Sequence, residues 1–191
     1  MKNKRNIPNM LTLGRVWVIP LIVATFFFKE AWAAWTGVVL FALAGITDYM
    51  DGYLARHLKQ GSCFGRVLDP IADKLLVGSI LVMLAYTGRL DNYYLILPAV
   101  IILCREILVS GLREFLAEIK VGLPVTKVAK WKTTFQMIAL PVLMSGEYGA
   151  KIPYLHAEII GPVALWFAAL MTVITGYDYW KSGSKYLKQD K

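Results

Sequence analysis

Cysteine, histidine and charged residues are all scarce in this chain of 191 residues, which has two cysteines, two histidines and 18% charged residues. Cys63 and Cys104 lack the spacing of a metal-ligand pair, so we expect both to be unpaired, with Cys104 filling space between helices. Soluble domains carry about a quarter charged residues, so this composition disfavours a disordered chain, a nucleic-acid-binding arm and a disulfide scaffold. Apolar residues make up 57% of the chain, a share typical of a polytopic membrane protein.

The apolar residues form six runs that separate at charged or Pro/Gly-rich points. We place these runs at about 9–28, 32–57, 65–87, 93–118, 124–145 and 158–180. Each run is long enough for a membrane-spanning helix, which needs roughly 20 residues. Pro70, Pro98 and Pro141 lie inside runs, where we expect them to kink the helices. The sequence therefore predicts an all-α membrane protein with six transmembrane helices that form one domain over residues 1–191.

The basic residues predict the orientation of this bundle and explain its net charge of +8. With six spans both termini lie on one side, and nearly all of the basic residues belong to that side. Only Lys29, Arg89 and Lys151 belong to the other. The positive-inside rule therefore makes both termini cytoplasmic, and we expect a multi-pass protein of the cell inner membrane whose active site faces the cytoplasm. Because the basic clusters lie between apolar runs, they indicate topology and no nucleic-acid partner.

Four aspartates interrupt the apolar helices within residues 47–74. Asp48 and Asp51 are three residues apart near the end of the second run, and Asp69 and Asp73 are four apart near the start of the third. Each pair therefore projects from one face of its own helix. The short turn between the runs makes the two helices antiparallel, so the two acidic faces can meet.

Four carboxylates at membrane depth need a counter-charge, because each unpaired one costs roughly 2.5–3.5 kcal/mol. Carboxylate oxygens suit magnesium, manganese or calcium, and no cluster of cysteine and histidine indicates zinc. One or two such ions would neutralise the group better than Arg56, Arg66 and Lys74 would. Ion pairing with those bases at the interface is the alternative structural interpretation.

A second alternative is a divalent-cation or proton-coupled transporter that uses the aspartates as a permeation site. The acids cluster toward one side and no inverted repeat is visible, which disfavours transport. Between the acidic pairs the residues Gly52, Ala55 and Gly65 are small. They leave room either for a ligand or for close approach of the helices.

The arrangement Asp48-x2-Asp51-Gly52-x2-Ala55-Arg56-x8-Gly65-x3-Asp69-x3-Asp73 fills every position of a signature and resembles the CDP-alcohol phosphatidyltransferase family. The segments 7–15, 105–113 and 130–137 are similar to those of bacterial phosphatidylglycerophosphate synthases within that family. One departure is Ala129, where this similarity leads us to expect glycine. The resemblance thus extends over most of the chain.

The resemblance implies that CDP-diacylglycerol donates its phosphatidyl group to an alcohol and that CMP leaves. It implies one or two Mg²⁺ or Mn²⁺ ions, and the residues that would hold them are Asp48, Asp51, Asp69 and Asp73. It assigns the role of catalytic base to Asp73 as well. The residues implied in binding CDP-diacylglycerol are Asn9, Thr12, Gly52, Ala55, Arg56 and Gly65. A homodimer surrounded by membrane lipids is also implied.

An acceptor with its own phosphate, such as glycerol 3-phosphate, needs fixed cations. Four candidates at the expected cytoplasmic ends of the fourth and fifth runs are Arg105, Arg113, Lys130 and Lys132. They also fit the alternative roles of setting topology and binding lipid headgroups. Arg105 fits these roles least well, because it lies well inside an apolar run beside Glu106. Serine, inositol phosphate and phosphatidylglycerol stay open as other acceptors.

Overall fold

The computed structural model describes residues 7–58, 63–119, 121 and 127–187. These residues form helices and no strand, which confirms the all-α prediction. The helices are α1 (Ile7–Thr25), α2 (Ala31–Leu58), α3 (Cys63–Tyr86), α4 (Tyr93–Glu118), α5 (Lys127–Ala150) and α6 (Ala157–Leu187). Each begins and ends within a few residues of a predicted run, except that α5 and α6 continue further at their C-terminal ends.

Local signals fix the connection between α3 and α4. Gly88, with φ of +73°, follows the end of α3, and the N–H of Arg89 donates to the carbonyl of Leu84 at 2.9 Å. This is how a helix C-terminus is commonly closed. Asn92 then caps α4, because its side-chain oxygen accepts from the N–H of Leu95 at 3.1 Å. These turn residues explain why the boundary at Tyr93 could be predicted to the residue.

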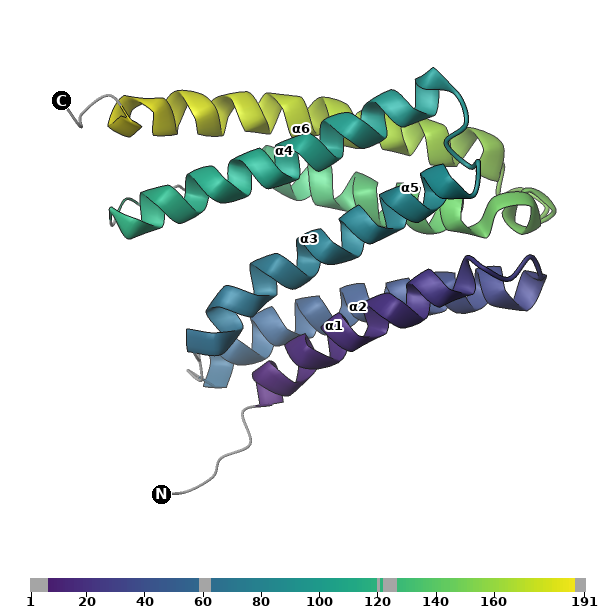
Figure 1. Ribbon diagram of the computed structural model, residues 1–191, viewed down its shortest axis with the longest axis horizontal. Coiled ribbons are helices and arrows are strands. Elements are labelled where there is room, and N and C mark those ends of the chain that lie inside the picture. The colour runs from purple at the N-terminus through teal and green to yellow at the C-terminus, as the bar shows by residue number, and fades with distance from the viewer. Residues whose placement is uncertain (1–6, 59–62, 120, 122–126, 188–191) are drawn as a thin grey trace.

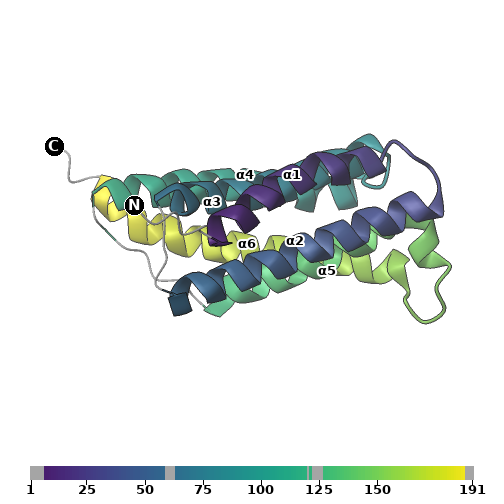
Figure 2. The same cartoon turned by 90° about the horizontal axis from the view of Figure 1, so that it is seen from below.

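The helices pack as two groups with α3 between them (Figure 1). In the first group, α1 packs against α2, and it also contacts α3. In the second, α6 packs against α4 and α5. Helix α3 contacts α4 and α5, and α2 runs along α5 (Figure 2). Among the described residues, no packing contact joins α2 directly to α3.

The helices alternate in direction through the bundle (Figure 1). The start of α1 and the end of α6 therefore lie at one end of the molecule, on the left of Figure 1. The end of α2, the start of α3, the end of α4 and the start of α5 lie at this same end. The predicted site residues lie on the halves of the helices toward this end, which we call the site end, except that Arg105 lies at the middle of α4.

Within the described ranges, three helices are long and apolar enough to cross a membrane, through the segments Ala31–Asp48, Tyr93–Glu118 and Ala157–Tyr186. Helix α1 contains a shorter apolar stretch, Thr12–Thr25. The prediction of six spans is therefore supported for α2, α4 and α6 and remains a prediction for the others. Helices α3 and α5 carry the charged residues of the candidate site in their N-terminal halves, which lowers the mean hydropathy of both helices.

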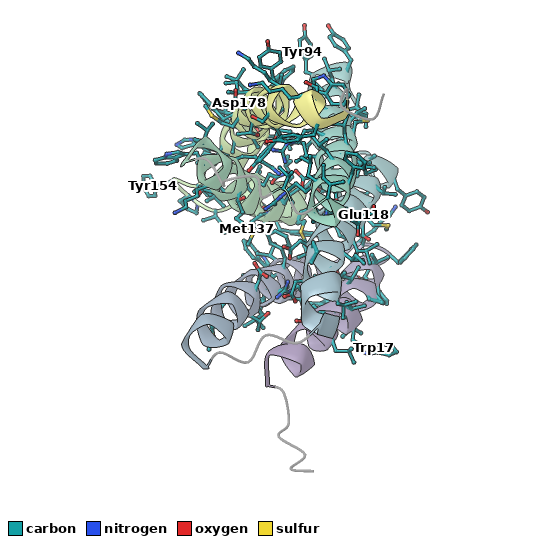
Figure 3. The ribbon with its side chains drawn as sticks, turned by 90° about the vertical axis from the view of Figure 1, so that its left-hand side faces the viewer. Trp17, Tyr94, Glu118, Met137, Tyr154 and Asp178 are labelled. Carbon is teal, nitrogen blue, oxygen red and sulfur yellow. The ribbon has the colours of Figure 1, made fainter. Side chains whose placement is uncertain are left out.

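Large apolar side chains cover the outside of the bundle, as expected for a surface in contact with lipid. Trp17 and Tyr154 are 70% and 94% exposed, and both point away from the helices (Figure 3). Cys104 is free, as predicted, but it is exposed on α4 and does not fill space between helices. The prediction of its packing role was therefore wrong. The side chain of Cys63 lies outside the described residues.

The interior is filled by apolar side chains from every helix. Ile22, Phe41, Leu84, Leu140 and Leu165 are each at most 1% exposed and belong to one cluster. In lipid the stabilisation comes from close packing more than from removal of apolar surface from water.

A glycine of α2 faces a methionine of α5. A Cβ at Gly45 would lie 2.1 Å from the Cε atom of Met137, so an alanine there would require the end of the Met137 side chain to move.

Helix α5 breaks at Gly146, where φ and ψ are +51° and −134°. Pro141 was the expected kink position and does lie inside α5, but the non-helical residue is Gly146. The guanidinium of Arg89 donates to the carbonyls of Leu143 and Met144, just before the break. Arg89 thus supplies hydrogen bonds to backbone groups that the break leaves without helical partners.

Gly146→Ala should lower the thermal stability of the protein. The new Cβ would lie 3.1 Å from Arg89 Cζ, and a positive φ costs a non-glycine residue about 1–2 kcal/mol. We expect a melting temperature several degrees lower in detergent, measured by circular dichroism. The control is Gly111→Ala on α4, where a Cβ meets nothing within 4 Å. Alanine at this position should stabilise the helix by about 0.5–1 kcal/mol. Equal melting temperatures for the two variants would contradict this account of the break.

Candidate functional site

A buried arginine joins the two acidic helices. The side chain of Arg15, on α1, is 0% exposed, and its Nη1 lies 2.7 Å from Asp48 Oδ1 of α2 and 2.8 Å from Asp73 Oδ1 of α3. One guanidinium nitrogen therefore bridges carboxylates from two helices that share no direct packing contact in the described part of the chain. The Asp48 and Asp73 side chains are 47% and 53% exposed, so their remaining oxygens are accessible.

A second contact joins α1 to α3, about one helical turn from Arg15. The Thr12 hydroxyl, on α1, donates to Asp69 Oδ1 of α3 at 2.6 Å, and Thr12 is only 1% exposed. Thr12 and Arg15 are three residues apart on α1, and Asp69 and Asp73 are four apart on α3, so each pair lies on one helical face. The polar face of α1 therefore meets the acidic face of α3 over one helical turn. Helix α1 connects the two acidic faces that the spacing predicted would meet.

Five residues of the predicted site lie in described helices, but only their backbone is described: Asn9, Asp51, Gly52, Ala55 and Arg56. Gly65 is buried in the first turn of α3. Among the side chains that are described, no three acidic, histidine or cysteine residues come close enough together to hold a metal ion.

The oxygens of Asp48, Asp69 and Asp73 nevertheless fit a hard divalent cation by their chemistry. All three are carboxylates, the ligands that magnesium and manganese prefer. Two of them, Asp48 and Asp73, already share the positive charge of Arg15 at 2.7 and 2.8 Å.

A cavity of about 300 Å³ opens beside the acidic group. The predicted base Asp73 and the four cations predicted to bind the acceptor all line it. These residues are Asp73 of α3, Arg105 and Arg113 of α4, and Lys130 and Lys132 of α5. The volume of the cavity is at the lower end of the range for small-molecule sites. The structure thus brings together residues that are up to 59 positions apart, from Asp73 to Lys132.

Glu106 organises two of the cations. Its Oε1 accepts from the Lys132 ammonium and lies 3.4 Å from Arg105 Nη1. Lys132 is 6% exposed, so this pairing offsets the cost of burying its charge. Arg105 Nη2 also donates to the Thr175 hydroxyl of α6 at 2.8 Å. Both cations are therefore held in fixed positions at the cavity wall.

Three residues that the sequence did not predict also hold the site together. Arg15 was counted only as a topological charge, although a cation inside an apolar run is itself a signal of an interior partner. Thr175 and Tyr179 of α6 contact the cations of α4, but threonine and tyrosine are common in apolar runs and give no such signal. Only the tertiary structure identifies them.

The geometry of the site agrees with what sequence comparison shows. A model of the family described as CDP-alcohol phosphatidyltransferase matches residues 5–174. This chain belongs to the CDP-alcohol phosphatidyltransferase family. The resemblance seen in the signature is thereby confirmed. The aspartate residues and the cavity lining, except Tyr179, lie in the matched part of the chain.

Relatives within the family match nearly the full length. The chain is 48% identical over 186 residues to the CDP-diacylglycerol--glycerol-3-phosphate 3-phosphatidyltransferase of Rickettsia bellii, covering 97% of this chain and 99% of that protein. It is 41% identical to the protein of the same name from Cereibacter sphaeroides, again over 97% of this chain and 99% of the relative.

A solved structure has the same fold. The phosphatidylinositol phosphate synthase of Mycobacterium tuberculosis, crystallised with CDP-DAG bound, superimposes with a TM-score of 0.64 at 18% identity. The match covers 92% of this chain and 85% of that one. At this identity the likeness establishes the arrangement of the helices and not the substrate.

Thr12→Val should destabilise the contact between α1 and α3. Valine keeps the shape but loses the donor, and a hydrogen bond to a charged group contributes about 1.5–3 kcal/mol, less here because Asp69 is partly exposed. For a protein of this size we expect the melting temperature in detergent to fall by about 2–6 °C. Thr12→Ser, which keeps the hydroxyl, is the matched control and should lose less than half as much. Equal losses for valine and serine would show that the methyl group, and not the hydrogen bond, matters.

Proposed function

We propose that the protein transfers the phosphatidyl group of CDP-diacylglycerol to glycerol 3-phosphate, giving phosphatidylglycerophosphate and CMP. The observation that carries this proposal is the single cavity that Asp73 shares with four cations. A carboxylate beside a cluster of cations suits an acceptor that has both a reacting hydroxyl and a phosphate. Relatives that carry the corresponding enzyme name match over nearly their full length.

We place the reaction at the cytoplasmic face of the inner membrane. The basic residues gather at the site end of the bundle, which by the positive-inside rule faces the cytoplasm. Water-soluble glycerol 3-phosphate would enter the cavity from this side, while the acyl chains of the donor stay among membrane lipids.

All six helices would span the bilayer and form one domain over residues 1–191. The active form would be a homodimer.

The donor would bind on the acidic side of the site. The residues proposed to contact CDP-diacylglycerol are Asn9, Thr12, Gly52, Ala55, Arg56 and Gly65. One or two Mg²⁺ or Mn²⁺ ions would be held by Asp48, Asp51, Asp69 and Asp73. When bound, the metal supplies positive charge to the diphosphate of the donor and so favours the departure of CMP.

Asp73 would act as the catalytic base. Its carboxylate lines the cavity, where it can accept the proton of an acceptor hydroxyl. The hydroxyl oxygen then forms a bond to the phosphorus that carries the diacylglycerol, and the bond from this phosphorus to the oxygen of CMP breaks with its electron pair. Arg15 holds the Asp73 carboxylate at a fixed position through the contact at 2.8 Å.

The cations would position the acceptor. Arg105, Arg113, Lys130 and Lys132 line the cavity and would bind the phosphate of glycerol 3-phosphate. Holding a hydroxyl in line with the reacting phosphorus converts a two-molecule encounter into a local step, which can lower the barrier by several kcal/mol. Glu106 contributes by fixing Lys132 and Arg105 before the acceptor arrives.

Purified protein given labelled CDP-diacylglycerol and a panel of acceptors tests this function. With Mg²⁺ present we expect CMP release and a lipid product with glycerol 3-phosphate, and no product with serine, inositol phosphate or phosphatidylglycerol. EDTA should abolish turnover. Product from another acceptor with none from glycerol 3-phosphate would refute the acceptor, and turnover in EDTA would refute the metal.

Matched variants accompany this assay. Asp69→Asn removes one negative charge at nearly constant shape and should abolish activity without preventing insertion in the membrane. The control is Asp178→Asn on α6, an exposed carboxylate outside the cavity, which should leave activity unchanged (Figure 3). Equal activity of the two variants would contradict the role given to the acidic group.

A further inference from the structure

A single aromatic ring lies beneath two of the cavity arginines. The Cζ atoms of Arg105 and Arg113 lie 5.7 Å and 5.9 Å from the centroid of the Tyr179 ring. Tyr179, on α6, is 5% exposed and lines the same cavity. Both distances are within the range of an attractive cation–π contact, which is stronger where water is excluded.

This arrangement counters a repulsion that the site itself creates. Arg105 and Arg113 are eight residues apart on α4 and project from the same face, so their like charges oppose each other. Both guanidinium groups gain from the negative face of one ring, which lowers the cost of keeping them together. Val109 lies between them in the sequence, and it packs against Tyr179 in a small apolar cluster with Leu112 and Leu116. The cluster fixes the ring, and the ring fixes the two cations.

Thr175 extends the same face of α6. It lies four residues before Tyr179, is 0% exposed, and accepts from Arg105 Nη2 at 2.8 Å. Arg105 Nε, in contrast, is buried without a hydrogen-bond partner among the described residues. Thr175 and Tyr179 both lie beyond residue 174, where the match to the family model ends.

We propose that Tyr179 is a positioning residue for the acceptor: its ring holds Arg105 and Arg113 as a pair that binds the phosphate dianion of glycerol 3-phosphate. The proposal rests on the function proposed above and adds to it a residue from the last helix. Tyr179 touches neither reacting atom. Its effect should therefore be on the affinity for the acceptor and not on the donor or the chemical step.

Two substitutions separate the ring from the hydroxyl. Tyr179→Phe keeps the aromatic face and the apolar packing, whereas Tyr179→Leu keeps an apolar side chain without the face. For Tyr179→Leu we expect KM for glycerol 3-phosphate to rise roughly 5- to 30-fold, with KM for CDP-diacylglycerol unchanged. For Tyr179→Phe we expect both constants within about twofold of wild type. KM does not depend on the folded fraction, so partial unfolding of a variant would lower only the apparent kcat.

Two controls exclude a merely structural role. Leu116→Ala disturbs the same apolar cluster from the α4 side without lining the cavity. Tyr177→Leu removes an exposed aromatic ring from the same helix. Both should keep the wild-type KM for glycerol 3-phosphate even where the melting temperature falls. An equal rise in KM for Leu116→Ala and Tyr179→Leu would overturn the proposal, and so would a rise of that size for Tyr179→Phe.

A binding measurement separates this proposal from the proposed function. Glycerol 3-phosphate should raise the melting temperature of the wild type and of Tyr179→Phe, and should require roughly 5- to 30-fold higher concentration to do so in Tyr179→Leu. If wild type binds glycerol 3-phosphate but does not transfer to it, the function is wrong and the positioning role still stands. If wild type transfers normally and all Tyr179 variants share its KM and its binding curve, only the positioning role is wrong.

Discussion

The site depends on one buried guanidinium. Arg15 has no exposed side-chain surface, and removing its partners would leave a charge inside an apolar bundle at a cost of several kcal/mol. Asp48 and Asp73 supply the opposite charge from two helices that do not pack against each other among the described residues. The position of α1 is therefore set by the same carboxylates that the proposed chemistry uses. Because these carboxylates are half exposed, they can satisfy Arg15 and still present oxygens to a ligand.

Asp73 belongs both to the acidic group around Arg15 and to the cavity lined by the cations. On one side Asp73 pairs with Arg15 in the acidic group, where the donor and its metal are proposed to bind. On the other side it lines the cavity with Arg105 and the other acceptor cations. The two substrates of a transfer reaction need such a meeting point, since the donor phosphorus and the acceptor hydroxyl have to come into contact. The packing of the helices thus places the acidic group on one side of Asp73 and the cavity cations on the other.

Much of this could be predicted from the sequence, because apolar runs and helical spacing are local properties. The bounds of α4 were predicted to the residue, and the spacing of Asp69 and Asp73 correctly placed both on one face of α3. Arg15 could not be assigned to the carboxylates, because its partners are 33 and 58 residues away and only the packing of α1 selects them. The break in α5 lies at Gly146 and not at Pro141, because Arg89 from a distant loop stabilises the open carbonyls there.

The role of Asp73 as the meeting point is tested most directly by Asp73→Asn in two parallel measurements: metal-dependent binding of CDP-diacylglycerol, and the single-turnover rate of transfer to glycerol 3-phosphate. Asparagine keeps the shape and an oxygen ligand but cannot take the proton. The account predicts that donor and metal still bind while the rate falls by about 10²- to 10⁴-fold, the usual contribution of a general base. Turnover near the wild-type rate, or loss of metal binding as complete as that of Asp69→Asn, would show that Asp73 is not the base.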